Sequence, residues 1–177
     1  MRRPFAALSL SALALLATGQ GLAVHAQDEP QKVLESGSTG LNISAINAKV
    51  AQGDAAAAAG NLSKAKADYD QARLAAQNLS RFYRNLSGSF RGLDARIPRE
   101  MDQKGRETLE LQASVDLRLA ALLRRMNQPE VAVPLLVEVV QIMTPASPMG
   151  QKAYQGLVEL GFVTTPYAGA AAAPAGS

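Results

Sequence analysis

Few residues of this chain could carry out acid–base or metal chemistry, and their spacing is poorly suited to either. Glu107 and Glu110 lie three residues apart, a spacing that puts both carboxylates on one face of a helix, and Asp68 and Asp70 are close in sequence. Paired carboxylates transfer protons or bind a hard cation only in a cleft that sets their separation. No calcium-loop spacing, glycine-rich phosphate loop or nucleophile motif accompanies them. We therefore interpret them as surface ion-pairing groups.

The composition excludes nearly all histidine and cysteine chemistry. The 177 residues contain no Cys and a single His, His25. Thiolate nucleophiles, histidine-based triads and most transition-metal sites require one of these two residue types. The sequence therefore predicts a protein that is not an enzyme, with no catalytic residue, no cofactor and no metal.

Basic residues are concentrated in residues 81–106, where seven Arg and Lys side chains accompany three acidic ones. One interpretation is a basic tip of a helical hairpin that docks an acidic partner or an anionic surface through Arg91, Arg96 and Arg99. The other is a solvated helix end whose arginine stems cover apolar surface. The sequence leaves both interpretations open.

Residues 1–26 predict a signal peptide. Arg2 and Arg3 are followed by a mostly apolar, uncharged run at residues 5–17 and by small residues near Ala26, where a signal peptidase could cleave. This run is shorter than the roughly 20 apolar residues that a membrane-spanning helix needs. We expect export to the periplasm or another extracytoplasmic compartment; an uncleaved membrane anchor is the alternative.

Cleavage changes what the net charge implies about partners. It removes two of the 18 basic residues and none of the 15 acidic ones, which leaves a net charge of +1. A nearly neutral protein has no overall field with which to capture nucleic acid. We therefore expect a protein or peptide partner, no nucleic acid, and at most peripheral contact with a membrane, while a homo-oligomer is left open.

An all-α domain is predicted for residues 42–163. No stretch alternates with period two, and apolar residues recur at helical spacing instead. Before this domain, residues 27–41 form a polar, flexible segment, and after it residues 164–177 form an Ala-, Gly- and Pro-rich tail with too few large side chains to order itself. Helices are expected at residues 44–59, 63–95, 98–126, 129–143 and 148–161.

The second of these helices has the most regular pattern. Its apolar positions recur at steps of three and four: Leu62, Ala65, Tyr69, Ala72, Ala76, Leu79, Tyr83, Leu86, Phe90, Leu93 and Ile97. Such a repeat predicts a helix of about 50 Å, packed in the manner of a coiled coil against the antiparallel helix that follows. Gly88 and Gly92 each oppose it by about 1 kcal/mol, so a break near Gly88 is the alternative.

Residues 129–143 combine a Val-rich composition, which suits a buried strand, with Pro129 at a natural helix start. We expect a helix, because no second strand is available for pairing. Pro134 lies inside it and should kink or loosen it.

Two groups of residues resemble the tetratricopeptide repeat. Gly53, Ala65, Tyr69 and Ala72 match its small and aromatic positions, with Gly60 at the turn between its helices. Small residues allow the two helices of such a repeat to approach closely, and the aromatic residue forms a wedge between them.

The second group lies downstream, and Ala120 follows Gly53 by about two of the 34-residue periods typical of this repeat. Its members are Leu119, Ala120, Leu123, Ala132, Leu136 and Val139, with Pro145 just beyond. The two groups therefore resemble repeats one and three. Residues 87–120 between them do not match, and their long hairpin is interpreted as a local elaboration.

The resemblance implies a stack of helical hairpins that binds a peptide or protein in a groove. We therefore expect an exported, non-catalytic protein–protein interaction module or scaffold. The alternative is a structural, self-associating protein of the cell envelope or of a membrane surface. Fold alone does not decide between them.

Overall fold

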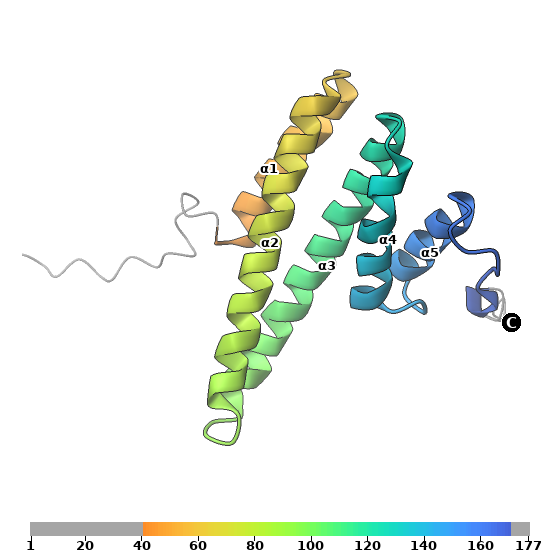
Figure 1. Ribbon diagram of the computed structural model, residues 1–177. Coiled ribbons are helices and arrows are strands. Elements are labelled where there is room, and N and C mark those ends of the chain that lie inside the picture. Colours follow the sequence, from red (N-terminus) through yellow and green to blue (C-terminus); the bar gives the residue numbers. More distant parts are fainter. Residues whose placement is uncertain (1–40, 171–177) are drawn as a thin grey trace, which may run out of the picture. The chain divides into compact units, whose positions relative to one another are not determined.

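The computed structural model describes residues 41–170, and within them the chain is helical with no strand, so the expected all-α class is confirmed. The predicted signal peptide (1–26), residues 27–40 and the last seven residues of the predicted tail lie outside the described residues. The elements are α1 (Ile43–Ala58), α2 (Leu62–Phe90), α3 (Arg96–Arg125), α4 (Pro129–Met143), α5 (Pro148–Glu159) and the short 3-10 turn η1 (Ala168–Ala170) (Figure 1).

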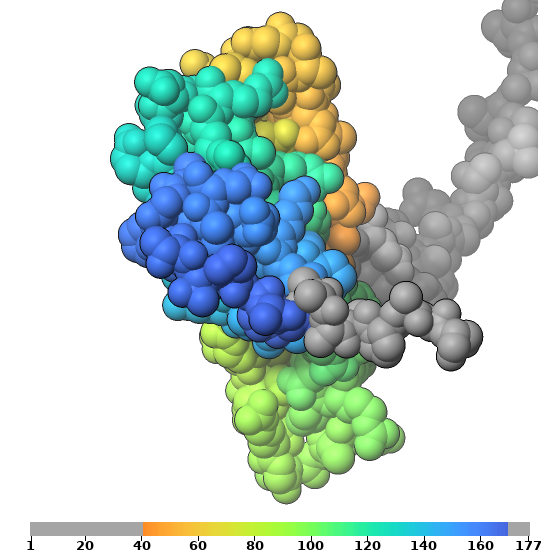
Figure 2. All heavy atoms as spheres, turned by 90° about the vertical axis from the view of Figure 1, so that its right-hand side faces the viewer, coloured from red at the N-terminus to blue at the C-terminus, as the bar shows by residue number. Residues whose placement is uncertain are grey.

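Each helix packs mainly against its neighbours in the chain. α2 and α3 form a long antiparallel hairpin, α1 lies along the first part of α2, and α4 along the last part of α3. Contacts also join α1 to α3 and α3 to α5. The far end of the α2–α3 hairpin extends beyond α1 and α4, where no third helix of the described residues covers it (Figures 1 and 2).

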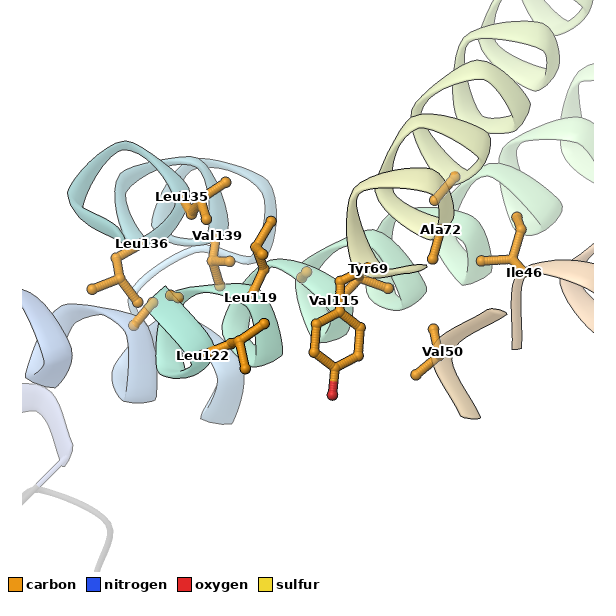
Figure 3. Close-up of a cluster of buried hydrophobic side chains, with 14 of the residues drawn as sticks. Ile46, Val50, Tyr69, Ala72, Val115, Leu119, Leu122, Leu135, Leu136 and Val139 are labelled. Atoms are coloured by element: carbon orange, nitrogen blue, oxygen red, sulfur yellow. The ribbon is translucent and has the colours of Figure 1, made fainter. Parts of the chain in front are cut away.

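One continuous apolar core joins these helices (Figure 3). It begins with Ile46 and Val50 of α1, crosses α2 and α3, and reaches Leu136 of α4 and Leu157 of α5. The predicted apolar positions of α2 from Ala65 to Tyr83 are buried in it. Burial of this stripe stabilises a helix whose own propensity is modest.

Gly53 and Tyr69 make a close contact between α1 and α2. A Cβ atom placed on Gly53 would lie 2.5 Å from Cε1 of Tyr69, so the aromatic ring rests directly on the α1 backbone. The Tyr69 hydroxyl donates a hydrogen bond of 2.6 Å to Oδ1 of Asp54, which fixes the ring at its other end.

The other members of the two residue groups, one ending at Ala72 and the other at Val139, are also buried, and the two groups are related by a constant sequence offset. One and the same sequence interval separates Gly53 from Ala120, Ala65 from Ala132, Tyr69 from Leu136, and Ala72 from Val139. No further helical pair lies between the two groups: the interval is taken up by the length of α2 and α3. The hairpins α1–α2 and α3–α4 are therefore direct neighbours in space.

The predicted extent of the second helix is wrong at its C-terminal end. Gly88 does not break α2, which ends at Phe90 instead of continuing to about residue 95. Gly92 has a φ of +84°, a left-handed conformation that begins the turn. Leu93, expected in the apolar stripe, is 80% exposed, because at this end of the hairpin no described helix covers it.

Helix starts differ slightly from those predicted. Asn61, rather than Ser63, caps α2 by accepting a hydrogen bond of 3.1 Å from the Lys64 amide. α3 begins at Arg96, two residues before the predicted start at Pro98. At the start of α5, Ser147 caps the helix as predicted, with its hydroxyl accepting from the Gly150 amide at 3.0 Å.

Two further segments near the C-terminus have defined structure in their described residues. Residues 129–143 are helical throughout, including Pro134, as predicted. The first residues of the segment 164–177, expected to be unstructured, lie against α5. There the Tyr154 hydroxyl donates to the Thr165 carbonyl at 2.7 Å, and its ring packs edge-to-face on Tyr167.

Candidate functional site

The positive charge of the described residues is concentrated at the far end of the α2–α3 hairpin. Residues 80–109 contain seven basic and four acidic side chains, whereas the other described residues contain eight of each. The hairpin end therefore carries the whole excess of positive charge in residues 41–170. A local field of this kind attracts acidic groups.

A hollow of about 240 Å³ lies between α2 and α3 in this region, and we call it the basic hollow. It combines three guanidinium groups with apolar surface from Met101 and Leu109. The residues that line it are Ser80, Arg84, Arg91, Met101, Asp102, Gly105, Arg106 and Leu109.

Gly105 helps to keep the basic hollow open. A Cβ atom added there would meet only the Cβ of Tyr83, at 3.8 Å, which is an ordinary van der Waals contact. The glycine is therefore not required for close packing of the two helices, and its missing side chain leaves space in the hollow.

The arginines of the basic hollow form no ion pair with an acidic side chain among residues 41–170. The side chains of Arg84 and Arg91 form no hydrogen bond or ion pair with any other described residue. Arg106 donates from Nη2 to Oε1 of Gln103 at 2.7 Å, and this acceptor is neutral. Three positive charges thus line one hollow, and none of them forms an ion pair within residues 41–170.

Asp102 is the one acidic residue in the lining, and its carboxylate has a structural partner. Oδ1 of Asp102 accepts a hydrogen bond of 2.6 Å from the hydroxyl of Ser87, which is fully buried on α2. This bond joins the two helices beside the hollow, and it satisfies a buried hydroxyl that would otherwise lose its hydrogen bonds to water.

The three arginines singled out from the sequence do not all line the basic hollow. Arg91 lines it, Arg99 is exposed outside it, and Arg96 is the first residue of α3, with its side chain 89% exposed. Arg96 binds Asp94 through its side chain, at 2.7 Å from Nη2 to Oδ2 and 3.1 Å from Nε to Oδ1. These hydrogen bonds lower the pKa of Asp94 and raise the pKa of Arg96.

Arg84 and Arg106 also line the basic hollow, although they were not among the three arginines singled out from the sequence. Arg84 lies in α2 and Arg91 directly follows the end of α2, and their spacing of seven residues, about two helical turns, was a usable signal. Arg106 could be added only with the register between α2 and α3, which the sequence does not specify.

A second group of charged residues, which we call the Arg73 cluster, lies where α2, α3 and α4 meet. Arg73 of α2 donates from Nε to Oδ1 of Asp116 at 2.7 Å and from Nη2 to Oε2 of Glu138. Oε1 of Glu138 accepts from Nε2 of Gln112 at 2.7 Å and from Nε2 of Gln77 at 3.2 Å. The cluster thus ties the two hairpins together through one guanidinium.

Asp116 is the unusual member of the Arg73 cluster. Its side chain is fully buried, and Oδ2 has no hydrogen-bond partner among the described residues. Burial, together with the nearby charge of Glu138, raises the pKa of Asp116 to about 7, although Arg73 and Gln112 oppose the shift. Nothing in the sequence pattern indicated this group, because its members are brought together only by helix packing.

The carboxylates considered for catalysis are placed in ion pairs or on the surface. Asp68 pairs with Lys64 at 2.6 Å and Asp70 with Lys66 at 2.7 Å, both at a spacing of four residues along α2. Glu107 accepts a hydrogen bond from Gln103 on the exposed side of α3. Within residues 41–170, no three or more His, Cys, Asp and Glu side chains form a group that could hold a metal ion.

The helices of the described part are too short or too polar for any of them to cross a bilayer.

In comparisons with known proteins, no protein-family model matches the chain, and no curated protein or solved structure matches it either.

Proposed function

We propose that this protein is a non-catalytic interaction module that docks an acidic segment of a partner protein in the basic hollow of the α2–α3 hairpin. The observation that carries this proposal is the presence of Arg84, Arg91 and Arg106 around one hollow without an acidic partner among residues 41–170. A guanidinium group binds a carboxylate through two parallel hydrogen bonds, which makes carboxylates the matching ligands.

The size and lining of the basic hollow favour a protein segment over a small metabolite. Its volume of about 240 Å³ is below the roughly 300–1,000 Å³ of small-molecule sites. One or two side chains of a partner fit such a volume. Met101 and Leu109 offer apolar contact beside the arginines, so a segment that mixes acidic and apolar residues suits the hollow better than a purely acidic one.

The architecture supports a scaffold for such binding. In this proposal the hairpins α1–α2 and α3–α4 are tetratricopeptide-like units, supported by the close contact of Gly53 with Tyr69 and by the constant sequence interval between matching buried positions. The long α2–α3 hairpin is the elaboration that carries the binding surface. The leader-like residues 1–26 support export as the setting in which the partner is met.

Fluorescence anisotropy with a labelled peptide of alternating Glu and Leu tests the proposed docking. The double variant Arg84→Glu/Arg106→Glu should weaken binding by at least about tenfold, which corresponds to about 1.4 kcal/mol. The matched control is Arg96→Glu/Arg99→Glu, which changes the net charge by the same amount on the same hairpin end but outside the hollow. We expect it to weaken binding by about threefold or less, through the long-range field alone.

A variant that leaves the charge unchanged provides a second test of the same site. Gly105→Leu places a larger side chain in the basic hollow, and Gly105→Ala is its control, because an added Cβ makes only an ordinary contact. The leucine variant should lose the peptide and the alanine variant should keep it. Equal loss in the two charge-reversal variants, or unchanged binding in Gly105→Leu, would show that the hollow is not the docking site.

A further inference from the structure

We propose that the Arg73 cluster is a proton-operated clasp, in which one proton held by Asp116 keeps α4 firmly packed on α2 and α3 and loss of that proton loosens the contact. The inference concerns the junction between the two hairpins. It does not depend on what the basic hollow binds.

The geometry places two carboxyl groups on one guanidinium. Arg73 reaches Asp116 of α3 through Nε, at 2.7 Å, and Glu138 of α4 through Nη2. Asp116 is fully buried, whereas the side chains of Arg73 and Glu138 are 27% and 29% exposed. If both acids are ionised, the cluster carries one net negative charge, and its least solvated carboxylate has to hold it.

Oδ2 of Asp116 indicates which acid takes the proton. This oxygen is buried and accepts no hydrogen bond from a described residue. Glu138 has more hydrogen-bond donors, because both of its carboxylate oxygens accept hydrogen bonds, from Arg73, Gln77 and Gln112. A buried carboxylate with one oxygen left without a donor is costly in free energy, so protonation of Asp116 neutralises the cluster at a lower cost than protonation of Glu138.

The charged groups around Asp116 are few. Arg73 faces it from α2 and Glu138 from α4, and the neutral Gln112 lies beside it on α3. The charged residues of α1 are occupied elsewhere, since Lys49 lies 3.9 Å from Asp68 and Asp54 lies 3.3 Å from Arg118.

The remaining neighbour of α3, helix α5, has two charged residues. Glu159 pairs with Arg124 at 2.9 Å, and Lys152 forms no ion pair with a described residue. One guanidinium therefore has to balance two carboxylates.

The direction of the pH dependence follows from burial. The pKa of Asp116 is raised from 3.8 to about 7, so between these pH values the unfolded chain releases this proton while the folded chain keeps it. The stabilisation is complete below about pH 4 and is lost as the pH rises to about 7. Within this window, the contribution of Asp116 raises the unfolding equilibrium constant by up to about tenfold for each pH unit.

Urea unfolding of the full chain between pH 5 and 8, compared with Asp116→Asn, tests the clasp. The amide oxygen of the variant can still accept from Arg73, but the side chain cannot ionise. The wild type should lose stability relative to Asp116→Asn as the pH rises toward 7. Asp54→Asn is the matched control, because Asp54 also pairs with an arginine but is half exposed. The free energy of unfolding of this variant should change with pH in the same way as that of the wild type.

Two further measurements keep the proposal falsifiable if Asp116→Asn fails to fold. The ¹³C carboxyl signal of Asp116 in the wild type should titrate near pH 7, and the amides of α4 should exchange with solvent faster above that pH, after correction for the intrinsic rate. A carboxyl signal that titrates below pH 5 would overturn the proposal. So would unfolding curves of the wild type and Asp116→Asn that stay parallel across the pH range.

Discussion

Gly53→Ala should destabilise this protein, although alanine is a better helix former than glycine. The substitution adds one methyl group in the middle of α1, at the point where the Tyr69 ring lies on the helix backbone. The added Cβ would be 2.5 Å from Cε1 and 2.6 Å from Cδ1 of that ring, far inside van der Waals contact. Either the ring or the helix has to move.

The magnitude follows from two opposing effects. Replacing Gly by Ala inside a helix gains about 1 kcal/mol from propensity. Overpacking a tight contact costs about 1–3 kcal/mol. The Tyr69 ring is only 4% exposed and its hydroxyl is bonded to Asp54, so it cannot turn aside easily. We therefore place the overpacking cost at the upper end and expect a net loss of about 1–2 kcal/mol in the free energy of unfolding.

Gly88→Ala is the matched control, because it makes the same substitution in a helix where no atom lies within 4 Å of the added Cβ. It should stabilise the protein by about 0.5–1 kcal/mol. Urea unfolding followed by far-ultraviolet circular dichroism measures both variants. Gly53→Ala should also cost less in a Tyr69→Leu background, because the smaller side chain leaves room for the methyl group.

Opposite signs for the two alanine variants are the critical result. If Gly53→Ala were as stabilising as Gly88→Ala, the close contact between α1 and Tyr69 would not exist. The same outcome would remove the packing argument for a tetratricopeptide-like pair.

Three further predictions concern single side chains. Gly150→Ala should destabilise the protein by about 2–4 kcal/mol in thermal unfolding, because the added Cβ would lie 1.8 Å from the backbone carbonyl oxygen of Thr144. An unchanged melting temperature would contradict the geometry of the α4–α5 turn. Tyr69→Phe should cost about 1 kcal/mol below pH 10. Because burial and the bonded Asp54 raise the pKa of Tyr69 to about 12, the wild type should lose stability relative to this variant between pH 10 and 12, and absorbance titration of the phenol should locate that pKa. Leu79→Ala removes a side chain that is only 1% exposed and should lower the free energy of unfolding by about 2–5 kcal/mol. Leu93→Ala, at the exposed turn, should change it by less than about 0.5 kcal/mol. Similar costs at the two positions would contradict the end of α2 at Phe90.

Much of the fold could be predicted from the sequence, because its signals are local. The three- and four-residue steps from Ala65 to Tyr83 depend only on helical geometry, and their burial follows from the apolar side chains. The cap at Ser147 and the helix start at Pro148 are local as well. The end of α2 was misplaced because Gly88 and Gly92 are the same residue type, and only the tertiary position of the turn decides which adopts a positive φ.

The candidate sites were harder to predict, because their members come together across helices. Arg73 is 43 residues from Asp116 and 65 from Glu138, so no spacing rule relates them. The basic segment was visible in the sequence, but which of its arginines line the hollow depends on the register between α2 and α3. That register places Arg106 beside Arg84 and leaves Arg96 to its own neighbour Asp94.

An NMR titration of the full, ¹⁵N-labelled chain with the alternating Glu–Leu peptide tests the central claim most directly. Amide shifts should change first at Arg84, Arg91, Gly105 and Arg106, on both sides of the basic hollow, while α5 stays unaffected. Shifts centred on another surface, or no shifts at millimolar peptide, would contradict docking at the α2–α3 hairpin.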